Sequence, residues 1–231
     1  MTTQTDKHLR PIRSFVRREG RMTAAQRRAL EELWPRFGLD SGGAMLDPAA
    51  SFGRAAPVVV EIGFGNGESL LAMAVAQPQK NFIGVEVHRP GVGQLLGLLA
   101  ERGIENVRLV CDDAKEFLAQ QVPDDSLDGL QLFFPDPWPK VRHHKRRLVQ
   151  AEFVQLVRRK LRIGGQFHMA TDWQHYAEYM LAVMTEAQGF RNDAGAGQYA
   201  ARPQHRPQTK FERRGQRLGH GVWDMVFSRT D

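Results

Sequence analysis

Three glycines at alternate positions mark the first place where this chain could bind a ligand. Gly63, Gly65 and Gly67 follow a short apolar run, and Glu61 stands two residues before the first of them. Glycines without a Cβ let the backbone pass close to a ligand. The spacing differs from the Gly-x-Gly-x-x-Gly of nicotinamide dehydrogenases, and Glu68, directly after the loop, would repel a pyrophosphate. We interpret the loop as a site for a ligand with positive charge; a tight turn beside a surface Glu is the alternative.

Two further acidic positions follow later apolar runs of the chain. Glu86 lies 19 residues after Gly67, where a carboxylate can accept hydrogen bonds from the two ribose hydroxyls of a nucleoside. Asp112 and Asp113 follow the next run. A carboxylate there could accept from an adenine amino group, or it could cap the helix that begins at Ala114. One residue of the pair could do each job.

The segment 133–140, Phe-Phe-Pro-Asp-Pro-Trp-Pro-Lys, is the richest in chemistry. Prolines flank Asp136 and restrict the backbone, which predicts a rigid loop and not a strand. Such a loop suits a flat base, because aromatic rings stack on it while the acid accepts from its edge. A proline-stiffened turn with a buried Trp138 would explain the rings but not the acid. The basic run 142–147 that follows is suited to phosphates.

Two more motifs lie toward the C-terminus. Asp172 ends another apolar run, where it could cap the next helix or face a ligand. The segment 209–212, Thr-Lys-Phe-Glu, has the form of a capping box. Basic residues around it favour a helix start near an anion.

Charge is unevenly distributed over the 231 residues, which carry a net charge of +6 and a pI of about 9.8. Residues 1–37 hold nine Lys or Arg against four acids, residues 139–162 hold nine against one, and residues 201–217 hold six against one. If the three segments converge in space, they form a face that binds a polyanion. Scattered, solvated surface charge is the alternative.

Other features exclude several classes of protein. One cysteine, Cys111, excludes an intramolecular disulfide framework and a cysteine-cluster metal site. The eight histidines show no ligand spacing, so we expect no metal. No apolar run is long enough to cross a membrane, and the polar N-terminus lacks the core of a signal peptide. A cytoplasmic location is the expectation.

The elements that must position these residues alternate regularly. Strands are predicted at 58–62, 81–87, 107–111, 127–134, 166–171 and 222–228, and helices at 23–37, 68–77, 91–102, 114–121, 148–161, 173–188 and 210–218. Residues 1–20 are expected to be a flexible basic arm, and 39–57 a connector. The alternation predicts a mostly parallel α/β sheet covered on both faces. Ligands bind such sheets at the carboxyl ends of the strands.

In combination these features resemble a known family. The glycine loop, the acids at 61 and 86 and the five strands resemble the class I S-adenosylmethionine methyltransferases. The segment 133–138 followed by Lys140 and 144–147, then 171–173, 209–212 and 215–224, is similar to the tRNA (guanine-N7-)-methyltransferase family. The resemblance spans residues 57–228, although Pro139 stands where many relatives carry another residue. It implies a Rossmann-like fold with an antiparallel C-terminal strand, a basic arm and helix at 1–56 and a methyltransferase domain at 57–231.

The family implies methylation of N7 of a guanosine at position 46, in the variable loop of tRNA, with S-adenosylmethionine as methyl donor, tRNA as partner and no obligatory protein partner. Asp136 would be the catalytic residue. By the same resemblance, the cofactor would be held by Glu61, Gly63, Gly65, Gly67, Glu86 and Asp113. The substrate would meet Lys140, Arg146, Asp172, Thr209, Lys210, Phe211 and Glu212.

The basic run is expected to set the affinity for tRNA through contacts of Lys140, Lys145, Arg146 and Arg147 with phosphates. The residues alone leave three other interpretations of the function open. One is a methyltransferase acting on an amino group of adenine or of a protein, because an Asp-Pro loop also suits an amine. The second is a non-catalytic RNA-binding protein with a methyltransferase fold, and the third is a nicotinamide dehydrogenase.

Overall fold

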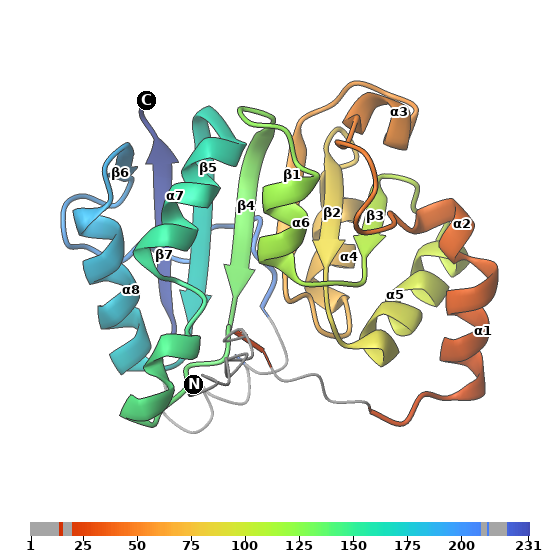
Figure 1. Ribbon diagram of the computed structural model, residues 1–231, viewed down its shortest axis with the longest axis horizontal. Coiled ribbons are helices and arrows are strands. Elements are labelled where there is room, and N and C mark those ends of the chain that lie inside the picture. Colours follow the sequence, from red (N-terminus) through yellow and green to blue (C-terminus); the bar gives the residue numbers. More distant parts are fainter. Residues whose placement is uncertain (1–13, 16–19, 209–211, 213–220) are drawn as a thin grey trace, which may run out of the picture.

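The computed structural model describes residues 14–15, 20–208, 212 and 221–231, and shows a single seven-stranded sheet with helices on both faces (Figure 1). The strands are β1 (Val58–Ile62), β2 (Asn81–Val85), β3 (Val107–Val110), β4 (Leu127–Phe133), β5 (Leu161–Thr171), β6 (Phe190–Asn192) and β7 (Trp223–Arg229). Their order is β3-β2-β1-β4-β5-β7-β6. The first five are parallel, whereas β7 runs antiparallel to both β5 and β6. The predicted fold class is confirmed.

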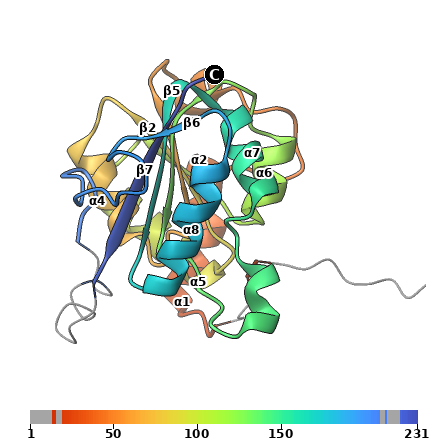
Figure 2. The same cartoon turned by 90° about the vertical axis from the view of Figure 1, so that its left-hand side faces the viewer.

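The helices form two layers around this sheet (Figure 2). One face is covered by α6 (Ala114–Gln120), α7 (Ala151–Lys160) and α8 (Gln174–Glu186), and the other by α1 (Ala24–Glu32), α2 (Trp34–Phe37), α4 (Glu68–Ala76) and α5 (Arg89–Glu101). Each face has its own buried apolar cluster. Because β1 is covered on both sides, all five of its residues are buried, which explains its continuous apolar run.

The N-terminal helices join the same core as the sheet. Thr23 and Gln26 form a capping box at the start of α1. The helix predicted over 23–37 is interrupted at Leu33, because Pro35 opens a second short helix. The backbone N–H of Leu39 donates to the carbonyl of Leu109 on β3. A short helix, α3 (Pro48–Phe52), lies inside the predicted connector.

Several predicted boundaries were wrong. The helix predicted over 148–161 begins only at Ala151, and a separate 3₁₀ helix, η1 (Val141–Arg146), precedes it. Strand β5 begins at Leu161, directly after α7, and passes through the two glycines that were expected to end the helix. Strand β6 was not predicted, because its three residues lack a clear alternation. The predicted helix 210–218 lies outside the described residues, apart from Glu212.

The strand order reverses between β1 and β4, since β2 and β3 lie on one side of this pair and β5 on the other. The carboxyl ends of these parallel strands point to the same edge of the sheet (Figure 1). Ligands of doubly wound sheets bind at this switch point. No helix of the described part of the chain is both long and apolar enough to cross a membrane.

Candidate functional site

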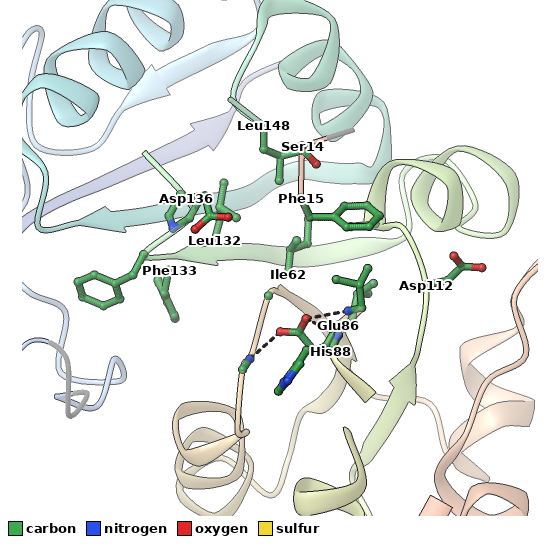
Figure 3. A pocket seen from close by; sticks show the side chains of 17 residues that line it. Ser14, Phe15, Ile62, Glu86, His88, Asp112, Leu132, Phe133, Asp136 and Leu148 are labelled. Carbon is green, nitrogen blue, oxygen red and sulfur yellow. Dashed lines mark hydrogen bonds between the residues drawn. The ribbon is translucent and has the colours of Figure 1, made fainter. Parts of the chain in front are cut away.

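A cavity of about 490 Å³ opens at the carboxyl ends of β1, β2 and β4. Its volume lies within the usual range for small-molecule sites. Figure 3 shows the side chains that surround it, among them Glu86, Asp112 and Asp136. Ser14 and Phe15 also line it, a position of the predicted arm that no sequence pattern indicated. The strand order thus brings together acids that lie up to 50 residues apart in the chain.

The glycine loop forms one wall of the cavity and is braced by Glu86. Gly63 and Gly65 line the cavity with positive φ angles of 75° and 59°. One oxygen of Glu86 accepts from the backbone N–H of Gly65 at 2.9 Å, and the other accepts from Val87 and His88 at 2.7 and 2.9 Å. The three amides fix the carboxylate in one orientation, so its remaining lone pairs face predictable directions.

Gly67 and Gly91 make this loop possible by having no side chain. Gly67, at φ 81°, is the N-cap of α4, and a Cβ on it would lie 2.7 Å from the side chain of Leu95. A Cβ on Gly91 would lie only 2.0 Å from the carbonyl oxygen of Gly65. Helix α5 therefore packs directly against the glycine loop, and both positions exclude larger residues.

Glu61 is buried beside this wall, with 2% of its surface exposed. Burial and, second, the charge of Glu86 raise the pKa of Glu61 to about 8. Its Oε2 atom has no hydrogen-bond partner among the described residues. A buried carboxyl of this kind is stabilised as an anion by a nearby positive group, which fits a cationic ligand.

The two aspartates after β3 have different positions. Asp113 is the N-cap of α6, and its Oδ1 accepts from the backbone of Lys115 at 2.8 Å and of Glu116 at 3.5 Å. Asp112 lines the cavity, and its Oδ1 accepts from the N–H of Asp113 at 2.8 Å. The arrangement gives the cap to Asp113 and the cavity position to Asp112.

The loop after β4 forms the opposite wall and has a constrained backbone. Phe134 and Trp138 adopt positive φ angles of 51° and 46°, which are uncommon for non-glycine residues. Between them Asp136 is exposed and lines the cavity. The indole N–H of Trp138 donates to the carbonyl of Ser14 at 3.2 Å. The loop thus joins the cavity wall to the N-terminal segment.

The candidate substrate residues lie around this loop. Lys140 is exposed at the N-cap of η1, and the guanidinium of Arg146 lies 5.0 Å from the ring centre of Trp138. Asp172 follows β5, the neighbour of β4, but it does not cap α8; the N-cap is Trp173, without a side-chain cap bond. Thr209, Lys210 and Phe211 lie outside the described residues.

Glu212 belongs to a buried charge cluster that sequence reasoning missed. The guanidinium of Arg206, which is 1% exposed, donates to both oxygens of Glu212 at 2.7 and 3.0 Å and to both oxygens of Asp224 at 2.7 and 2.8 Å. His168 on β5 donates to Asp224 from Nε2 at 2.8 Å. Burial alone would raise the pKa of Asp224, but the hydrogen bonds from His168 and Arg206 outweigh it and lower that pKa.

This cluster lies against the candidate base-binding loop. The guanidinium carbon of Arg206 lies 5.9 Å from the ring centre of Phe133 and 5.7 Å from that of Phe134. The ring of His168 meets Phe133 edge-on at 4.9 Å. Nothing in the local sequence pattern distinguishes Arg206 from the other arginines of the same basic segment, because its partner Asp224 lies 18 residues away.

One prediction for the basic run was wrong. Arg147 was expected to contact phosphates, but only 2% of its surface is exposed. Its Nε donates to the carbonyl of Pro137 at 2.9 Å. The run therefore contains one buried arginine among exposed or half-buried basic residues.

Known proteins similar to this chain agree on its class. A family model described as "Putative methyltransferase" matches residues 55–225. The chain is 60% identical over 225 residues to a tRNA (guanine-N(7)-)-methyltransferase of Aeromonas hydrophila, covering 97% of this chain and 95% of that protein. It is 61% identical over 222 residues to the protein of the same name from Sodalis glossinidius, covering 96% and 93%.

Among solved structures, the chain is similar to a 16S rRNA (adenine(1408)-N(1))-methyltransferase with cosubstrate SAM from Catenulisporales acidiphilia. The TM-score is 0.53 at 16% identity, and the match covers 80% of this chain and 92% of that one. At this identity the likeness concerns the fold alone.

Proposed function

Because the chain belongs to the tRNA (guanine-N(7)-)-methyltransferase family, we propose that it transfers the methyl group of S-adenosylmethionine to N7 of guanosine 46 in the variable loop of tRNA. The observation that carries the proposal is the cavity at the strand switch point, with Glu86 fixed on one wall and Asp136 on the other. We expect the reaction to take place in the cytoplasm.

The wall formed by β1 and β2 fits S-adenosylmethionine, which supplies an electrophilic methyl group on a sulfonium when it is bound. Glu86 would accept from the two ribose hydroxyls, because three backbone amides hold both of its oxygens in place. Gly63 and Gly65 would let the backbone approach the ligand. The unpartnered carboxyl oxygen of Glu61 fits a positively charged group beside the loop.

For the adenine amino group the geometry favours Asp112 over Asp113, which already caps α6. Replacing Asp112 with asparagine should weaken cofactor binding, since the amide loses the charge of the acceptor. Replacing Asp113 with asparagine keeps a good N-cap and should leave binding nearly unchanged. Calorimetric titration of both variants compares the two roles, and an equal loss for Asp113→Asn would assign it a contact as well.

Asp136 would act on the guanine. N7 carries a free lone pair and no proton, so the reaction requires no general base, and alignment supplies most of the catalysis. The carboxylate would accept hydrogen bonds from the ring N1–H and the exocyclic N2 amino group of guanine and stabilise the positive charge that methylation leaves on the ring. The flanking prolines restrict the conformations of this acid before the substrate arrives.

The exposed basic residues Lys140 and Lys145 and the half-buried Arg146 would bind phosphates of the tRNA. The bond from Trp138 to the carbonyl of Ser14 places Ser14 next to the loop that leads into this basic helix, η1. Several phosphate contacts predict that affinity falls steeply as salt increases. Affinity that hardly changes between low and moderate salt would contradict a phosphate-binding surface here.

The decisive experiment incubates the protein with S-adenosylmethionine and an unmodified tRNA transcript, followed by digestion and mass spectrometry of the nucleosides. We expect 7-methylguanosine from the natural transcript and none from one with adenine at position 46. Methylated adenosine would favour the amino-group methyltransferase. Cofactor binding without any product on several tRNAs would favour a non-catalytic RNA-binding protein.

A variant then separates the role of Asp136 from cofactor binding. Asp136→Asn should lose most turnover, because the amide cannot balance the charge on the methylated ring. Its affinity for S-adenosylmethionine, measured by calorimetry, should stay unchanged. Loss of turnover that merely follows a loss of cofactor affinity would overturn the assignment.

A further inference from the structure

Arg147 differs from every other residue of the basic run 142–147 in being buried. It is 2% exposed, whereas Arg142 and Lys145 are exposed and Arg146 is half-buried. A buried guanidinium is costly unless its environment compensates the charge. The contacts of Arg147 therefore indicate which parts of the structure it holds together.

The guanidinium of Arg147 lies between two tyrosine rings of α8 and the loop after β4. Its Cζ atom is 4.8 Å from the ring centre of Tyr176 and 4.9 Å from that of Tyr179. Its Nε donates to the carbonyl of Pro137 at 2.9 Å. The rings compensate part of the charge through cation–π attraction, and the carbonyl takes one of the donors.

Gln150 ties the backbone of the same residue to α8. Its side-chain amide donates to the carbonyls of His144 and Arg147, both at 3.2 Å, and its oxygen accepts from the hydroxyl of Tyr179 at 2.8 Å. Both the side chain and the main chain of Arg147 are thus held against α8. The hydrogen bond from Arg147 to the Pro137 carbonyl then links α8 to the loop.

The rigid loop couples the position of the Pro137 carbonyl closely to that of Asp136. Asp136 lies between Pro135 and Pro137, whose rings fix two backbone angles. A shift of the Pro137 carbonyl therefore displaces the neighbouring carboxylate. Helix α8 also follows Asp172, so Arg147 connects the two loops that carry candidate substrate acids.

We propose that Arg147 is a positioning residue for methyl transfer, which sets the place of Asp136 by holding the Pro137 carbonyl against the tyrosines of α8, and does not bind tRNA phosphate. This inference rests on the proposed function only where its test measures kcat. Lysine cannot replace Arg147, because an ammonium lacks the planar group that faces both rings and donates from Nε.

The test compares Arg147→Lys and Arg147→Met with Arg146→Met, its neighbour in the chain, and with Arg191→Met. Arg191 is exposed on β6, so its variant controls for the loss of one positive charge. For each variant we would measure kcat at saturating tRNA and S-adenosylmethionine, cofactor affinity by calorimetry, and tRNA affinity over a range of salt concentrations.

Both Arg147 variants should lower kcat, on the order of 10²-fold if the carboxylate moves by about 1 Å. Their cofactor affinity and the salt dependence of their tRNA affinity should stay unchanged. Arg146→Met should instead weaken tRNA binding and reduce the salt slope by about one phosphate contact. Wild-type kcat in Arg147→Lys, or a reduced salt slope in Arg147→Met, would overturn the proposal.

A spectroscopic readout keeps the inference testable without catalysis. The indole N–H of Trp138, next to Pro137, gives its own signal in a nitrogen–proton correlation spectrum and is assigned with Trp138→Phe. Both Arg147 variants should shift this signal and Arg191→Met should not. If the unaltered protein forms no 7-methylguanosine, the proposed function fails, and the Trp138 signal still decides whether Arg147 holds the loop.

Tyr179→Leu decides the matter if neither Arg147 variant folds. It removes one of the two rings and leaves the guanidinium in place. It should shift the Trp138 signal and lower kcat in the same direction. An unchanged signal with unchanged kcat would overturn the positioning role.

Discussion

Replacing Glu61 with glutamine should make the cofactor-free protein more stable, and increasingly so as the pH rises. Glu61 is buried, and its pKa is raised from 4.5 to about 8 by burial and by the charge of Glu86. The folded protein therefore binds a proton at neutral pH that the unfolded chain has released. Stability due to this group is fully present below pH 4.5 and is lost as the pH rises through about 8.

The magnitude follows from the size of the shift. Between the two pKa values the free energy of unfolding falls by up to about 1.4 kcal/mol for each pH unit. From pH 5.5 to pH 7.5 this amounts to on the order of 2–3 kcal/mol, a large part of the total stability of a domain. Glutamine has nearly the same shape and no charge, so Glu61→Gln should not show this loss.

The assay is denaturant unfolding of both proteins without cofactor at several pH values between 5.5 and 8.5. The difference in unfolding free energy, variant minus wild type, should grow with pH and level off near the raised pKa. The contributions of titratable groups elsewhere in the chain to the unfolding free energy cancel in this difference. Glu101→Gln, an exposed substitution at the end of α5, is the matched control and should give a small, flat difference.

A flat difference for Glu61→Gln would refute the reasoning, because Glu61 would then ionise in the folded protein as it does in the unfolded chain. Calorimetry of S-adenosylmethionine binding at pH 7, in buffers of different ionisation enthalpy, gives a second check. A cationic group bound near Glu61 should lower its pKa and release up to about one proton. Binding without proton release would place the positive charge of the ligand elsewhere.

Three further predictions test other parts of the site. Gly91→Ala should weaken cofactor binding in a calorimetric titration, because its Cβ would lie 2.0 Å from the carbonyl oxygen of Gly65. Gly97→Ala is the control in the same helix: its Cβ meets open space, so the variant should raise the free energy of unfolding by about 0.5–1 kcal/mol. Arg206→Met should remove the guanidinium shared by two buried carboxylates, Glu212 and Asp224, and lower the free energy of unfolding by roughly 3–5 kcal/mol, so an unchanged Tm would contradict the cluster. Lys140→Ala should weaken tRNA binding with wild-type cofactor affinity and reduce the salt slope by about one; an unchanged slope would place Lys140 away from the phosphates.

Much of the fold was predictable because the local pattern of apolar residues shows which segments are buried in a sheet. The apolar run of β1, covered on both faces, and the alternation of strands with helices sufficed to predict a mostly parallel sheet. Boundaries were less accurate where two elements meet without a loop, as at Leu161, where α7 ends and β5 begins. Local propensity does not determine which element continues at such a junction, since packing against β4 decides it.

The candidate site, like the fold, was predictable from the sequence only in part. The sequence determined the chemical groups and their register after each strand, because glycines and acids at strand ends have a local signature: Gly65, Glu86 and Asp136 all line the cavity. The chemistry of the residues did not distinguish Asp112 from Asp113, since either can cap a helix, and the resemblance assigned the cofactor contact to Asp113. The tertiary structure separated the two by placing one in the cavity wall.

Only the tertiary structure decided which charged residues are buried. Arg147 and Arg206 lie in basic segments that look uniformly exposed in the sequence, yet each is enclosed by partners from distant elements. A charge is buried only where rings or carboxylates compensate it. Two of those partners, Tyr176 and Asp224, lie 29 and 18 residues further along the chain than the arginines they compensate. The sequence therefore determined which chemistry the site could hold, and the folding of distant segments against one another decided which residues position it.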